Sequence, residues 1–114
     1  MAKLKFRGNE IKGHLDIFIV DHEDDFDGDI QKLQEVMVHG DPEGLRSFAK
    51  LLIKIADLKQ EAEEALTIGA REHYHLRPNV ELSKSSVEVI VGRIDAKGTG
   101  SFYDRYVVKD SLKV

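Results

Sequence analysis

The segment GDPEGLRSFAKLLIKIAD, residues 40–57, carries the clearest structural signal in the chain. Asp41 is a favourable N-cap, because its carboxylate can accept hydrogen bonds from the free amides of a first helical turn. Pro42 suits the first helical position, where its missing N–H costs nothing. Glu43 places negative charge beside the positive end of the helix dipole. The segment therefore predicts a helix that begins at residue 42.

Apolar residues recur along this helix with the spacing that places them on one side. That side consists of Leu45, Phe48, Ala49, Leu52, Ile55 and Ala56. We expect it to pack on a sheet as part of the core. Helical spacing continues through residues 58–66, so two alternatives stay open. The main helix either covers about 42–58 and then breaks, or it runs on to 67.

Apolar and polar residues alternate on both sides of the helix, which predicts strands. The expected strands span residues 3–7, 14–20 and 33–39 before the helix and 72–77 and 86–94 after it, with one more β-prone segment over 102–108. We expect Val36 and Val38 to face inward. Because short turns join the strands, the sheet should be antiparallel. The prediction is an α+β fold of order β-β-β-α-β-β, mainly antiparallel, with one long helix packed on one face.

Length and composition restrict the class of protein. A chain of 114 residues predicts a single domain over 1–114. The absence of cysteine excludes disulfides and thiolate metal sites within the chain. We see neither a signal peptide nor an apolar segment long enough for a membrane, so we expect a cytoplasmic protein. The net charge of −4 argues against nucleic-acid binding and favours a basic partner.

Residues 21–29, DHEDDFDGD, hold six carboxylates in nine positions and predict a solvated acidic loop. The sequence argues against a calcium loop, because aligning Gly28 with the invariant EF-hand glycine puts Gln34 where the bidentate glutamate belongs. A dense negative field instead steers a cationic protein partner. The candidate partner-binding residues are Asp24, Asp25, Asp27 and Asp29.

The segment EHYHL, residues 72–76, places His73 and His75 on the same face of a strand. Two imidazoles can begin a metal site, but zinc needs at least one more protein ligand. The main interpretation is that both histidines face solvent while Tyr74 and Leu76 pack inward. A metal-binding protein or metal-dependent enzyme that uses His73 and His75 is the alternative. We find no nucleophile motif and expect neither catalytic residues nor a cofactor.

Three segments together carry a resemblance: VHGDPEGL at 38–45, EHYHL at 72–76 and SSVEVIVGR at 85–93. Over residues 35–95 the chain resembles the Immunity protein 32 family of bacterial polymorphic toxin systems. The resemblance implies a small cytoplasmic protein that binds and neutralises a toxin made beside it, with no catalytic role. A homodimer paired through a strand edge over 86–94 also stays open.

Overall fold

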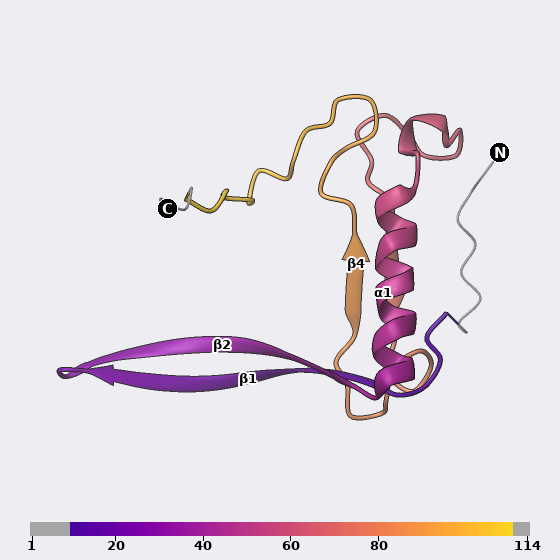
Figure 1. The fold of residues 1–114 in the computed structure, drawn as a ribbon. Coiled ribbons are helices and arrows are strands. Elements are labelled where there is room, and N and C mark those ends of the chain that lie inside the picture. The colour runs from indigo at the N-terminus through magenta and orange to yellow at the C-terminus, as the bar shows by residue number, and fades with distance from the viewer. Residues whose placement is uncertain (1–9, 111–114) are drawn as a thin grey trace.

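The computed structural model describes residues 10–110, which form two antiparallel two-stranded sheets and one long helix (Figure 1). The elements are β1 (Leu15–Phe26), β2 (Asp29–Gly40), α1 (Pro42–Asp57), the short 3-10 helix η1 (Gln60–Ala62), β3 (His73–Leu76) and β4 (Val89–Gly92). β1 pairs with β2, and β3 pairs with β4. This confirms the predicted α+β class. The strand expected over 3–7 lies outside the described residues.

Helix α1 begins where the sequence predicted, and its N-cap also ties down the preceding chain. Asp41 Oδ1 accepts hydrogen bonds from the N–H of Gly44 at 2.7 Å and of His14 at 3.0 Å. These two bonds lower the pKa of the Asp41 carboxyl, the bond from His14 contributing most. The cap thus joins the first turn of α1 to the start of β1.

The first turn of α1 lies so close to β1 that only glycine fits at its contact point. A Cβ built on Gly44 would lie 1.9 Å from the carbonyl oxygen of His14, and one on Gly40 would lie 2.9 Å from the same oxygen. Both glycines therefore serve close approach of two backbones. They hold the start of α1 against the chain that leads into β1.

Helix α1 ends at Asp57, which decides between the two alternatives for its length. Leu58 turns to an extended conformation, and Arg93 Nη1 donates to the Leu58 carbonyl at 2.7 Å. The buried side chain of Gln60 donates to the Asp95 carbonyl and accepts from the Glu72 N–H. Partners distant in sequence thus hold residues 58–62 away from the helical path.

The core lies between α1, the inner face of the β3–β4 sheet and the base of β1. Its buried residues are Ile11, Leu15, Ile17, Leu51, Ile55, Tyr74, Leu76 and Leu82. The predicted apolar side of the helix was partly wrong, since Leu45 is 44% exposed and Leu52 40% exposed. The small residues Gly44 and Ser47 face the core instead. They permit close packing, which rotates the helix relative to its most apolar side.

The β1–β2 hairpin projects from this core as an arm, here defined as residues 19–36 (Figure 1). The radius of gyration is 17.4 Å, against about 13 Å for a compact domain of this length. The accessible surface is 8779 Å² for 12.9 kDa, against roughly 6,300 Å² for a compact monomer of that mass. The arm is therefore a protruding ribbon that no other element within residues 10–110 covers (Figure 1).

The predicted acidic loop over 21–29 is wrong, because these residues form the end of the hairpin. β1 runs to Phe26, and Asp27 and Gly28 alone make the turn before β2. Their φ values of 52° and 91° are both positive, as in the two-residue type I′ turn that favours Asp-Gly. Asp25 Oδ1 accepts from the Gly28 N–H at 2.9 Å and supports the turn.

The third predicted strand is longer than expected and faces solvent. It extends over Asp29–Gly40, and Val36 and Val38 are 65% and 43% exposed rather than inward. The alternation in the sequence correctly predicts a strand here. The orientation was wrong because no element of the described chain covers this part of the hairpin.

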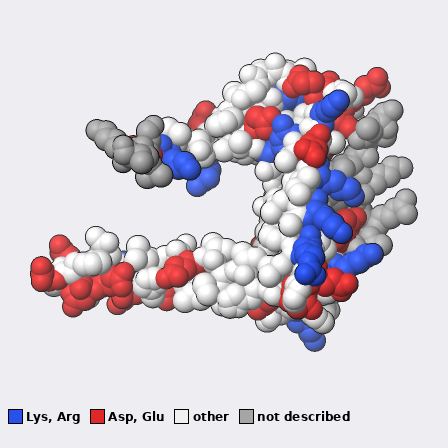
Figure 2. Space-filling model, viewed as in Figure 1, with Lys and Arg blue, Asp and Glu red and all other residues white. Residues whose placement is uncertain are grey.

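The C-terminal third contains less strand than predicted. β4 covers only Val89–Gly92, because Ser86 Oγ bonds to the N–H and carbonyl of Ile17, and the Val87 N–H bonds to the same carbonyl. Residues 102–108 form no strand and are exposed. In Figure 2 this segment and the hairpin reach out from the same side of the body.

Candidate protein-binding surface

The four predicted partner-binding aspartates come together at the end of the arm. Asp24 and Asp25 close β1, Asp27 lies in the turn, and Asp29 opens β2. We call these four residues, with Glu23, the acidic tip; Figure 2 shows acidic residues gathered at the end of the hairpin. Asp24 is half-buried and the other four are exposed. The sequence thus identified the cluster, and the structure gives it a protruding position.

The acidic tip presents charge in several directions rather than as one flat patch. Asp25 lies opposite Ile30 on one face of the ribbon, whereas Asp24 and Asp29 lie on the other face. Asp27 caps the end between the faces. A negative field of this shape attracts a cation from a wide range of approach angles.

Among the described residues, few basic side chains lie beside the carboxylates of the arm. His22 Nδ1 lies 2.7 Å from Glu35 Oε1, and His22 Nε2 lies 3.7 Å from Asp24 Oδ2. Lys32 lies opposite Glu23 across the hairpin. The pair of His22 with Glu35 was not predicted from sequence, because it depends on the register of the two strands.

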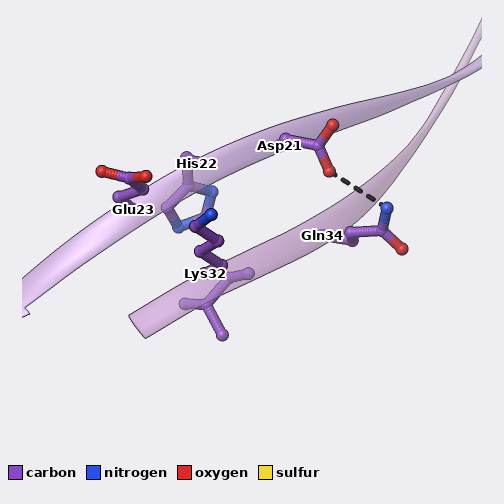
Figure 3. Close-up of a pocket in the computed structure, with 6 residues that line it drawn as sticks. Asp21, His22, Glu23, Lys32 and Gln34 are labelled. Atoms are coloured by element: carbon purple, nitrogen blue, oxygen red, sulfur yellow. Dashed lines mark hydrogen bonds between the residues drawn. The ribbon is translucent and has the colours of Figure 1, made fainter. Parts of the chain in front are cut away.

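A hollow of about 690 Å³ lies beside the middle of the arm (Figure 3). It is lined by Asp21, His22, Glu23, Lys32, Leu33 and Gln34. Figure 3 shows these side chains along the two strands of the hairpin, and Gln34 Nε2 donates to Asp21 Oδ1 at 3.0 Å. Sites for small molecules bury most of their ligand. This open ribbon is instead suited to contact with a macromolecule.

Apolar side chains follow the acidic tip toward the base of the arm. Ile19, Val36 and Val38 are 49%, 65% and 43% exposed and share one face of the hairpin. Contiguous exposed apolar surface on a soluble protein commonly marks an interaction site. The hairpin thus combines an acidic end with exposed apolar side chains at its base.

The two histidines of β3 lie on the outer face of the second sheet, and Tyr74 and Leu76 point into the core as expected. The rings of His73 and His75 are 5.1 Å apart between centroids. Glu88 Oε2 comes to 3.9 Å from His75 Nδ1. Within residues 10–110, no group of three or more His, Cys, Asp or Glu side chains is placed to hold a metal ion.

Carboxylates with a depressed pKa lie at joints of the fold. The hydroxyl of Ser83, and then that of Ser85, lower the pKa of Asp16 near the base of β1. The Arg93 guanidinium lowers the pKa of Asp95 through bonds of 2.9 and 2.6 Å. Arg93 also holds the C-terminal carbonyls of α1. These groups fix the body of the protein from which the arm projects.

Comparison with known proteins gives one family. In the described part of the chain, no helix has both the length and the apolar composition needed to cross a membrane. No curated protein and no solved structure matches the chain. Residues 35–94, from the middle of β2 through β4, match the model of Immunity protein 32. This segment spans more than half of the chain and includes Gly44, His73, His75 and Arg93, and on this match the chain belongs to the Immunity protein 32 family.

Proposed function

We propose that this protein is an immunity protein that binds a cognate bacterial toxin and neutralises it by direct contact in the cytoplasm. The observation that carries the proposal is the family match over residues 35–94. The protruding arm supports it, because an inhibitor of this kind needs a rigid scaffold and an accessible surface. The protein acts by binding and not by catalysis.

The toxin makes its first contact with the acidic tip and presents a basic surface to it. Asp24, Asp25, Asp27 and Asp29 supply the charge, and the chain as a whole carries a net charge of −4. Complementary charge raises association rates by about 10- to 1,000-fold at low salt. The tip lies outside the family-matched segment. It is therefore a surface on which individual members of the family can differ and select different toxins.

Co-expression tests the function itself. The protein is expressed with the product of the neighbouring toxin gene, and growth and co-purification are measured. Rescue of growth together with a stable complex is the expected result. A neighbouring gene product that is toxic with or without this protein, and that never co-purifies with it, contradicts the proposal.

Charge removal tests the role of the tip. The four aspartates are changed together to asparagine, which keeps the acceptor oxygen that Asp25 offers to the Gly28 N–H. We expect the association rate with the toxin to fall about 10- to 100-fold at low salt and to lose most of its salt dependence.

A matched control has the same charge change elsewhere on the surface. Its substitutions are Asp57→Asn, Glu64→Gln, Asp104→Asn and Asp110→Asn, all at exposed positions off the arm. The control should associate almost as fast as the unmodified protein. Equal rates for the two variants would remove the acidic tip from the mechanism while leaving the immunity function intact.

A further inference from the structure

Strand β2 has a free edge along the whole arm. The N–H of Asp41 donates to the carbonyl of His14 at 3.1 Å. Given the register of the two strands, even-numbered residues of β1 therefore bond to odd-numbered residues of β2. The N–H and C=O groups of the even-numbered residues of β2 point away from β1. These residues are Ile30, Lys32, Gln34, Val36 and Val38.

No other part of the described chain uses this edge. Among residues 10–110, the backbone groups of those five residues bond to no further element. An isolated two-stranded ribbon is marginally stable in water, and three or more strands are normally needed. A long unpaired edge is also a template for pairing with another chain. The arm therefore has both the means and the physical reason to gain a strand.

The two outer edges of the hairpin differ in charge. Between Ile19 and Phe26, β1 carries four carboxylates, and charged residues of one sign repel a second identical edge. β2 carries only Asp29, Lys32 and Glu35 as charged residues over twelve positions. It also holds five aliphatic or methionine side chains: Ile30, Leu33, Val36, Met37 and Val38. The β2 edge is thus the one that can pair with a copy of itself.

Ile30 indicates the register of such a pairing. It is 63% exposed and lies opposite Asp25, next to the turn and within the acidic tip. On its own face of the hairpin, the pairs Glu23–Lys32 and Asp21–Gln34 separate it from the apolar group Ile19, Val36 and Val38. Nothing within its own hairpin accounts for an exposed isoleucine there.

We propose that β2 pairs antiparallel with β2 of a second copy of this chain, giving a symmetric dimer with a four-stranded sheet. One register uses all five free residues: Gln34 opposite itself on the two-fold axis, Lys32 opposite Val36, and Ile30 opposite Val38 of the second copy. Ile30 then lies beside the apolar group of the second copy. The acidic β1 strands form the two outer edges of the sheet.

The side chains that this pairing brings together are exposed in the single chain. Ile30, Val36 and Val38 are 63%, 65% and 43% exposed. The chain as a whole exposes 8779 Å², which is roughly 2,500 Å² more than a compact monomer of its mass. Homodimer interfaces of the obligate kind bury about 1,000–2,500 Å² per partner. The dimer goes beyond the proposed immunity function and does not depend on it, because it is formed by this chain alone.

The first test is the mass of the purified protein in solution by light scattering and sedimentation at micromolar concentration. We expect twice the chain mass of 12.9 kDa. Val36→Pro removes an N–H that faces the free edge and no bond to β1, so it should give a folded monomer. Asp21→Pro makes the same change on the outer edge of β1 and should remain dimeric. Circular dichroism confirms that both variants fold.

The second test fixes the register by cross-linking. The chain has no cysteine, so Gln34→Cys introduces a single thiol on the proposed two-fold axis. Opposite residues of a hydrogen-bonded pair have Cα atoms about 5.5 Å apart, within the range of a disulfide. Under mild oxidation this variant should become a covalent dimer, whereas Glu23→Cys on β1 should stay largely uncross-linked.

Several outcomes overturn the dimer. A wild-type monomer at about 100 µM does so, as does equal behaviour of the two proline variants or of the two cysteine variants. Hydrogen exchange gives another such outcome. If the amides of the β2 edge exchange freely in the protein alone and are protected only when the toxin is bound, the dimer is overturned and the immunity function is supported. If the protein is a dimer but does not rescue growth from the toxin, the proposed immunity function is wrong and the proposed β2 interface stands.

Discussion

Replacing Gly44 by alanine has two opposite effects on the free energy of unfolding, and the size of each is known. Gly44 lies in the first turn of α1, where alanine normally stabilises a helix by about 1 kcal/mol relative to glycine. The added Cβ would, however, lie 1.9 Å from the His14 carbonyl oxygen, and real Cβ atoms essentially never come within 3.0 Å of such an atom. The helix start must therefore move by roughly 1 Å, in the manner of an overpacked core.

The movement has an energetic cost larger than the gain in helix propensity. Overpacking costs about 1–3 kcal/mol. The shift also strains the 2.7 Å bond from the Gly44 N–H to Asp41, and loss of an N-cap costs about 1 kcal/mol. After subtraction of the propensity gain, we expect Gly44→Ala to destabilise the protein by about 1–3 kcal/mol.

Urea unfolding of the full chain, followed by circular dichroism, measures this difference. A slope of about 2 kcal/mol per molar urea converts a loss of 2 kcal/mol into a midpoint lower by about 1 M. Ala49→Gly, at an exposed position of the same helix, calibrates the propensity term and should cost about 1 kcal/mol. A Gly44→Ala variant as stable as the wild type would refute the close contact between α1 and β1.

Three further predictions each concern a single residue. Gln60→Ala should destabilise the protein by about 1–3 kcal/mol in urea unfolding, because it removes two hydrogen bonds of a buried side chain. The control Gln31→Ala, at an exposed position, should change the free energy of unfolding by less than about 0.5 kcal/mol. The pKa of Asp41 is lowered in the folded state. Its ionised form therefore stabilises the fold at pH values above the unfolded-state pKa of about 3.9, and this contribution is lost as the pH falls through the folded-state pKa. Asp41→Asn should show a shallower loss of stability below pH 4 in acid unfolding, and an unchanged acid profile would contradict this role. Gly28→Ala forces a side chain into a turn position with φ of 91°. Amide hydrogen exchange should therefore become faster at the end of the hairpin and stay unchanged in α1. Equal acceleration in both regions would contradict this and show that the arm and the body unfold together.

How much of the fold was predictable depends on whether the deciding contacts are local. The helix start at Asp41-Pro42 depends on adjacent residues, and the alternation of β3 depends on its own four residues, so both were predicted. The acidic cluster was also predicted, because it depends on composition alone. Its place at a hairpin end could have been predicted as well, since Asp27-Gly28 is the dipeptide that a type I′ turn prefers; the density of charge favoured a loop instead.

The remaining features depend on contacts between residues distant in sequence. Arg93 and Gln60 end α1 near residue 57 through partners up to 38 positions away, and no local pattern marks that break. Val36 and Val38 alternate as buried residues do, yet they face solvent because no element within residues 10–110 covers this part of the hairpin. The local sequence is enough to place the start of α1, the strand β3 and the cluster of carboxylates. Which apolar faces are covered follows from tertiary packing, because burial depends on the arrangement of the whole chain.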